Sequence, residues 1–244
     1  MRHDRNRSIL LPILALALVA VVGVLLGNPR VMQERIDDLT APEPHRLDAP
    51  VRVRAHGAFA FFKTQDGDPG TPVAWSPCEP VPYEVNPAGA PPNWQLVVGA
   101  AVRTMQRATG LRFRYDGTTD ERDADRTQSG PLPVLVEWSD ASATPDLAGS
   151  VAGLGGSSWT QAPGDRAWFT RGSVVLDSDA FDDLRDTPDG RVEMRAIVVH
   201  ELGHVVGLAH VDDPRELMYG GTLQRRTLGP GDREGLARLG AVTC

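Results

Sequence analysis

The feature that most constrains the fold of this chain is a set of three histidines in a short, glycine-containing stretch. His200 and His204 are four residues apart, so a helix through them places both imidazoles on one face. Gly207 follows where such a helix has to stop, because glycine adopts positive φ without steric cost. The chain can then turn back and bring His210 close to the imidazoles of His200 and His204. The spacing predicts a helix over residues 191–206 and a turn that completes a three-histidine cluster.

Three imidazoles in this arrangement are typical of a catalytic metal site. Zinc binds neutral imidazole nitrogens at about 2.0–2.1 Å, and three protein ligands leave one position for water, whose pKa falls towards about 7. Glu201 follows the first histidine directly and is the candidate general base for this water. We therefore expect one catalytic zinc ion on His200, His204 and His210, although three imidazoles also suit other late first-row metals.

The remaining pattern predicts a mixed α+β domain. Apolar residues at spacings of three and four predict a helix over residues 93–109, with Asn93 as N-cap and Gly110 as C-cap. Pro230 suits the first turn of a further helix over 230–239. Short apolar or alternating stretches predict strands, and the glycine-rich stretch around 149–156 reads as a connection. The predicted strands lie at 59–62, 81–85, 111–115, 133–138 and 173–177.

The histidine motif resembles that of the metzincin metallopeptidases, and its surroundings resemble the matrixin branch. Met218 stands eight residues after His210, similar to the Met-turn of that family. The segments 211–214, 228–240 and 82–85 also resemble matrixin sequences. The resemblance implies a metzincin-like (zincin) fold with a twisted mixed sheet, an active-site helix and a small C-terminal subdomain. In that fold Gly207 and Met218 would support the metal site.

The resemblance also implies zinc-dependent endopeptidase activity on protein or peptide substrates. The histidines that hold a second, structural zinc in matrixins are absent from Leu147–Ser150 and Val174–Asp179. Asp177 could match a calcium ligand of the family, but Ala180 stands where an acidic partner is usual, so calcium stays unassigned. The pocket beside the zinc would be lined by the chain after Met218 and by the glycine-rich segment 148–160.

Two other functions remain open at this stage. A catalytically silent extracellular zinc-binding module would need only the histidines, but Glu201 argues against it, because a decayed enzyme would be expected to lose its base or a ligand. A zinc hydrolase of a non-peptide amide would use the same motif. The motif does not separate these substrates, because it determines the chemistry at the carbonyl and not the shape of the cleft.

The N-terminal part differs in composition from the rest of the chain. Residues 1–8 are basic, and residues 9–27 form an uncharged apolar run of about the length that spans a bilayer. The basic flank favours a single-pass anchor with the rest of the chain outside the cell membrane. A cleaved signal peptide and a secreted protein are the alternative. Residues 28–50 read as a proline-rich linker, and the metallopeptidase domain is expected over 51–244.

The cysteine content and the net charge indicate which covalent links and which binding partners to expect. Cys78 and Cys244 are the only cysteines, and an even pair in an exported chain predicts one disulfide. The alternative from the matrixin resemblance is a zinc-bound cysteine switch at Cys78, but Cys78 directly precedes the predicted strand over 81–85, which leaves little propeptide, and Cys244 offers a partner. The net charge of -7 argues against a nucleic-acid partner. The expected form is a monomer.

Overall fold

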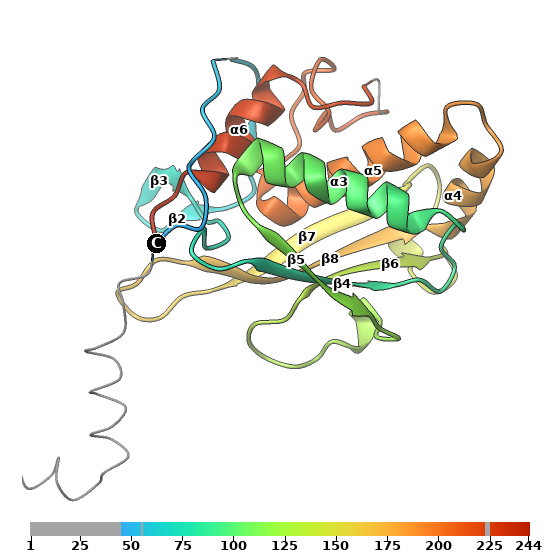
Figure 1. The fold of residues 1–244 in the computed structure, drawn as a ribbon, viewed down its shortest axis with the longest axis horizontal. Helices are drawn as coiled ribbons and strands as arrows, with labels where there is room; N and C mark the ends of the chain where they lie inside the picture. Colours follow the sequence, from blue (N-terminus) through green and yellow to red (C-terminus); the bar gives the residue numbers. More distant parts are fainter. Residues whose placement is uncertain (1–44, 55, 223–224) are drawn as a thin grey trace, which may run out of the picture. The chain divides into compact units, whose positions relative to one another are not determined.

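A five-stranded mixed sheet carries the fold (Figure 1). The computed structural model describes residues 45–54, 56–222 and 225–244. The strand order is β5-β4-β6-β8-β7, in which the first four strands are mutually parallel and β7 pairs antiparallel with β8 at one edge. The strands are β4 (Val81–Asn86), β5 (Phe113–Thr118), β6 (Val134–Ser139), β7 (Gly153–Thr160) and β8 (Trp168–Asp177).

Two long helices, α3 (Trp94–Thr109) and α5 (Gly190–Val206), cover one face of this sheet (Figure 1). The short helix α4 (Ser178–Arg185) connects β8 to α5, and α6 (Pro230–Gly240) packs against the ends of α3 and α5. Alternate residues of β6, Val134, Val136 and Trp138, are buried in the core under the helices. Burial of each such large apolar side chain contributes about 1.5–3 kcal/mol. The core therefore lies between the sheet and the two helices.

Most of the predicted elements are present. The helices predicted over 93–109, 191–206 and 230–239 correspond to α3, α5 and α6 within two residues. Gly110 closes α3 in the left-handed conformation with φ 75°, as the C-cap prediction requires. Asn93 occupies the N-cap position, but its side chain makes no capping hydrogen bond with the described residues. The α+β class is confirmed.

The predicted strand over 59–62 is shorter than expected. Only Ala60–Phe61 forms a strand, β1, and it pairs with β9 (Leu208–Ala209), which follows Gly207 directly. A separate small ribbon joins β2 (Thr64–Gln65) and β3 (Asp68–Pro72). The strand predicted over 173–177 begins earlier, at Trp168. Apart from the buried Phe169, its first half is only partly buried and carries polar residues, so its apolar pattern is weak.

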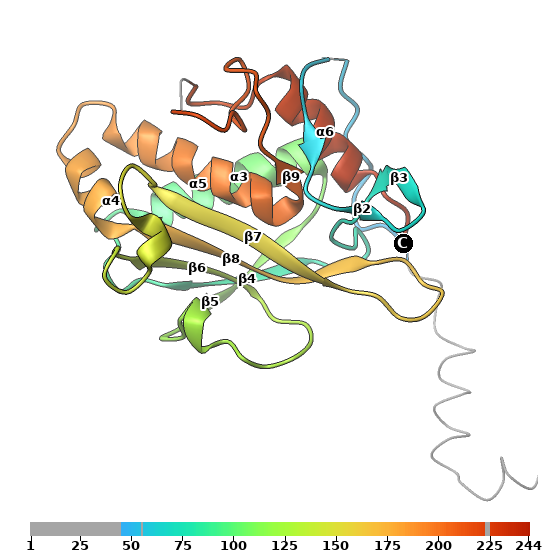
Figure 2. The same cartoon turned by 180° about the vertical axis from the view of Figure 1, so that it is seen from behind.

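The interpretation of the stretch around 149–156 as a connection is wrong from Gly153 onward, because Gly153–Thr160 is the edge strand β7 (Figure 2). Glycine is depleted in strands, so the sequence pattern favoured a loop. The glycines are needed because α5 passes very close. A Cβ on Gly155 would lie 2.3 Å from the carbonyl oxygen of Glu201. A Cβ on Gly153 would lie 2.9 Å from the Cγ atom of Glu201.

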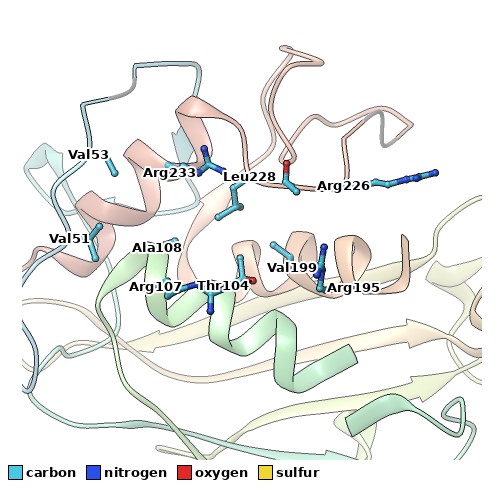
Figure 3. Close-up of a pocket in the computed structure, with 11 residues that line it drawn as sticks. Val51, Val53, Thr104, Arg107, Ala108, Arg195, Val199, Arg226, Leu228 and Arg233 are labelled. Carbon is cyan, nitrogen blue, oxygen red and sulfur yellow. Dashed lines mark hydrogen bonds between the residues drawn. The ribbon is translucent and has the colours of Figure 1, made fainter. Parts of the chain in front are cut away.

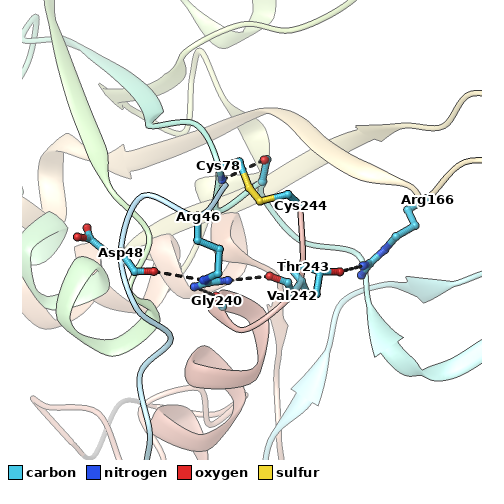
Figure 4. Close-up of a disulfide and its surroundings, with 9 residues drawn as sticks. Arg46, Asp48, Cys78, Arg166, Gly240, Val242, Thr243 and Cys244 are labelled. Carbon is cyan, nitrogen blue, oxygen red and sulfur yellow. Dashed lines mark hydrogen bonds between the residues drawn. A yellow bond between two sulfur atoms is a disulfide. The ribbon is translucent and has the colours of Figure 1, made fainter. Parts of the chain in front are cut away.

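The predicted disulfide between Cys78 and Cys244 is present, with Cα atoms 5.9 Å apart (Figure 4). It links the residues just before β4 to the end of the chain after α6. The neighbouring Arg46 donates hydrogen bonds of 2.7 Å to the carbonyl oxygens of Gly240 and Val242 (Figure 4). The disulfide and Arg46 together hold the C-terminal residues against the domain.

The packed domain begins before residue 51, the expected start. Arg46 contacts the C-terminal residues, and Asp48 accepts hydrogen bonds from Arg112. Residues 45–50 of the expected linker thus pack on the domain. The predicted basic segment 1–8, the apolar run 9–27 and the rest of the linker lie outside the described residues. Among the helices that the structure describes, none is long and apolar enough to cross a membrane.

The two neighbouring glycines of β7 provide a matched test of this packing. We expect Gly155→Ala to destabilise the fold by more than about 2 kcal/mol, because the new methyl group would collide with the α5 backbone. A Cβ on Gly156 meets no atom within 4 Å, so Gly156→Ala should stay within about 0.5 kcal/mol of the parent chain. Urea unfolding followed by circular dichroism measures both. Equal unfolding midpoints for the two variants would contradict the packing argument.

Candidate metal centre

The structure brings the three predicted histidines together. His200 and His204 project from one face of α5, and the turn after Gly207 returns the chain so that His210 meets them. The Nε2 atom of His210 lies 3.0 Å from the Nε2 atoms of both other imidazoles. Within the described ranges, this is the only group of histidine, cysteine or acidic side chains whose ligand atoms converge as a metal site requires. A calcium site stays unassigned.

Backbone carbonyl groups orient two of the three imidazoles. The Nδ1 atom of His200 lies 2.7 Å from the carbonyl oxygen of Leu217, and Nδ1 of His204 lies 2.9 Å from that of Leu208. Because a carbonyl oxygen only accepts hydrogen bonds, each Nδ1 carries the proton. The Nε2 lone pairs of both rings therefore point towards the shared centre. This is the outer hydrogen bonding that zinc-bound histidines usually show.

The donor set fits a zinc ion. Nε2 of His200 and Nε2 of His204 are unprotonated, and a proton on Nε2 of His210 could satisfy only one of the two close contacts, so at least one contact has no hydrogen bond within the cluster. A cation between them would satisfy all three lone pairs. Nitrogens bound tetrahedrally to one zinc ion lie about 3.3 Å apart, close to the observed separations. His200, His204 and His210 are the residues that would hold the ion.

Burial keeps the imidazoles in the form that binds metal. Desolvation lowers the pKa of His200 and of His204 to about 4, and it also lowers the pKa of His210. All three rings are therefore neutral at pH 7. A metal ion does not have to displace protons from them, so its binding at neutral pH is not opposed by histidine protonation.

Glu201 is buried beside the histidines, with only 7% of its surface exposed. Desolvation raises the pKa of its carboxyl group to about 8 in the metal-free chain. A nearby divalent cation favours the ionised carboxylate and lowers this pKa. Metal binding would thus convert Glu201 from a mostly protonated group into a base at neutral pH.

Gly207 and Met218, the two residues expected to support the metal site, are both closely packed. Gly207 has φ 124°, and a Cβ there would lie 2.9 Å from both Phe169 and Leu239. Met218 is buried directly against α5, where a Cβ on Gly203 would lie 2.6 Å from its Sδ atom. The glycine at 203 therefore permits the close approach between the helix and the methionine turn.

Sequence reasoning did not identify two buried carboxylates that position this turn. Asp232, in the first turn of α6, accepts hydrogen bonds from the backbone N–H groups of Leu217, Met218 and Gly229. Glu216 accepts from those of Gly231 and Asp232. The carbonyl oxygen of Leu217 in turn accepts the hydrogen bond from His200 Nδ1, so this network determines the orientation of a metal ligand. The sequence feature that could have indicated the role of Asp232 is its place in the first turn of a helix, where acidic side chains are favourable.

A cleft of about 1590 Å³ lies over the histidines. One wall comes from the glycine-rich segment up to Gly156, and another comes from Tyr219 and the residues that follow it. Both segments were expected to line the pocket. His200, Glu201 and His204 line this cleft along α5. The histidine cluster is thus accessible to a large ligand from the cleft.

Part of this chain is similar in sequence to a known family of metallopeptidases, the matrixins. The matrixin family model matches residues 154–239, a segment that runs from β7 through the histidine cluster to α6. This segment is therefore similar to matrixins, as the motifs of the sequence indicated. The match contains all three histidines, Glu201 and Met218.

Two solved structures that align with this fold are distant from it in sequence. A chain of the GM1-bound form of the ECX AB5 holotoxin aligns with 15% identity and a TM-score of 0.38, covering 66% of this chain and 79% of that one. Archaemetzincin from Methanopyrus kandleri aligns with 15% identity and a TM-score of 0.40, covering 65% of this chain and 93% of that one. A search of curated protein sequences finds no significant match.

The low pKa values of the buried histidines predict acid sensitivity of the metal-free chain. His200 and His204 have pKa values of about 4 when folded, against about 6.5 when unfolded. Their contribution to stability is fully present above pH 6.5 and is lost as the pH falls towards 4. Urea midpoints of the chelator-treated chain should fall across this range. The double variant His200→Asn/His204→Asn should show a smaller fall, and an unchanged pH dependence would contradict the assignment.

Proposed function

We propose that this chain is a zinc-dependent endopeptidase in which Glu201 acts as general base. The observation that carries the proposal is the convergence of three neutral imidazole nitrogens beside a buried carboxylate at the floor of an open cleft. Bound zinc would polarise the scissile carbonyl group and lower the pKa of the attacking water. Glu201 would take a proton from that water on its carboxylate and pass it to the leaving amine.

The edge position of β7 supports a peptide as the substrate. β7 pairs only with β8 in the described sheet, and residues 153–156 line the cleft. An extended peptide could add to such a free edge through backbone hydrogen bonds. A non-peptide amide would lack this repeating backbone. This favours a peptidase over the hydrolase of another amide, and we propose a monomer acting on protein or peptide substrates.

Replacement of Glu201 tests the mechanism. We expect Glu201→Ala to reduce casein cleavage by about 10²–10⁴-fold, because no other group would accept the water's proton, while the variant still binds one equivalent of zinc. Glu193→Ala is the matched control, since Glu193 is a carboxylate on the same helix that lines the same cleft. It should keep activity within a few-fold.

Metal content separates the alternative functions in the same experiment. Chelation should abolish cleavage by the parent chain, and zinc should restore it. One bound zinc with no cleavage of any peptide would favour the silent module. Undiminished cleavage by Glu201→Ala would disprove its role as base.

For localisation, we propose that residues 9–27 anchor the chain in the cell membrane with the catalytic domain outside. Their uncharged apolar composition and the basic residues before them support this proposal. Cell fractionation followed by an alkaline carbonate wash should leave the full-length chain in the membrane pellet. Release of a shorter chain into the medium would favour the secreted alternative.

A further inference from the structure

A second pocket of about 350 Å³ lies between α3, α5, the start of α6 and the segment around Val51 (Figure 3). Its volume is at the lower end of the range for small-molecule sites. It is distinct from the histidine cleft, because α5 contributes Arg195 and Val199 here but Ile197 and Glu201 to the cleft. The matrixin resemblance assigned no role to the residues that line it.

Arginine side chains surround this pocket. Arg107, Arg195, Arg226 and Arg233 line it, and none of the described lining residues carries a carboxylate. Arg226 is ion-paired with Asp189 and Glu193 and extends away from the pocket (Figure 3). The other three arginines form no ion pair with any described residue.

This concentration of positive charge is local. The whole chain has a net charge of -7, so three arginines without acidic partners are not a consequence of its composition. Arg107 has only the neutral hydroxyl of Thr104 as a side-chain partner among the described residues. Guanidinium groups bind carboxylates and phosphates well, because their donors match two oxygens at once. The pocket is therefore complementary to an anion.

The wall between the arginines is apolar. Val51, Val53, Val199 and Leu228 line the pocket together with Ala108. An inorganic anion would pair with the arginines but would leave these side chains exposed to water. A neutral apolar ligand would cover them but would leave the guanidinium groups unpaired. A ligand that matches both surfaces carries an anionic group on an apolar body.

We propose that this pocket binds a small organic anion, a phosphate or carboxylate attached to a compact apolar group. Arg107, Arg195 and Arg233 would contact the anionic group, and the valines with Leu228 would cover the apolar part. The proposal does not depend on peptidase activity, because it uses no residue of the histidine cleft.

Isothermal titration calorimetry on the chelator-treated full chain tests this assignment. Removal of metal prevents phosphate from binding at the histidines. The probes are phenyl phosphate, inorganic phosphate and phenol. We expect one equivalent of phenyl phosphate to bind, with the other two probes at least about tenfold weaker, since each lacks one of the two matching surfaces. Added salt should weaken the binding of phenyl phosphate.

Single substitutions test where phenyl phosphate binds. Arg195→Gln should weaken phenyl phosphate binding by about tenfold or more, the usual effect of losing a charged hydrogen bond. Arg191→Gln removes the same charge from an exposed position of the same helix and should leave the affinity unchanged. Arg107→Gln, on the surface of α3, provides a second test if Arg195→Gln fails to fold.

Three results would overturn the proposal. They are the absence of phenyl phosphate binding, equal affinity for inorganic phosphate, and equal affinity of the parent chain and the folded arginine variant.

Discussion

The close contact between α5 and β7 is the constraint on which the rest of the structure depends. No Cβ fits at Gly155, because the backbone of α5 at Glu201 occupies that space. The contact sets the distance between the active-site helix and the edge strand. It therefore determines both the burial of Glu201 and the width of the cleft beside it. A larger residue at Gly155 would move the helix that carries two metal ligands and the base.

A series of hydrogen bonds fixes the geometry on the other side of the metal site. Asp232 holds the backbone of Leu217 and Met218, and the carbonyl oxygen of Leu217 orients His200. The start of α6 thus determines the direction of a histidine lone pair. Because the carboxylate is buried and accepts three backbone hydrogen bonds, this turn has little freedom to move.

The metal-free site carries a free-energy cost that a cation would reduce. The Nε2 atoms of three neutral imidazoles lie close together, and a buried carboxyl group with a raised pKa lies beside them. A divalent ion would satisfy the lone pairs and stabilise the carboxylate. Because such an ion binds only the folded site, its binding also stabilises the fold. Metal binding and general-base function are thus linked through the burial of the same few groups.

The sequence alone was sufficient for the parts that depend on local spacing. His200, His204, Gly207 and His210 predict the helix, the turn and the metal cluster, because helix periodicity and glycine's freedom act over a few residues. The spacing of apolar residues likewise predicted α3. The pairing of Cys78 with Cys244 followed from there being no other cysteine.

Only the tertiary structure decided the features that arise between distant segments. The strand β7 was missed because its glycines reflect the approach of α5, which begins 30 residues after β7 ends, and not a local preference for loops. The role of Asp232 depends on a turn that precedes it in sequence but meets it only in the fold. The arginines of the second pocket come from three different helices and one loop. Such effects depend on which surfaces pack together, and local sequence patterns do not predict that packing.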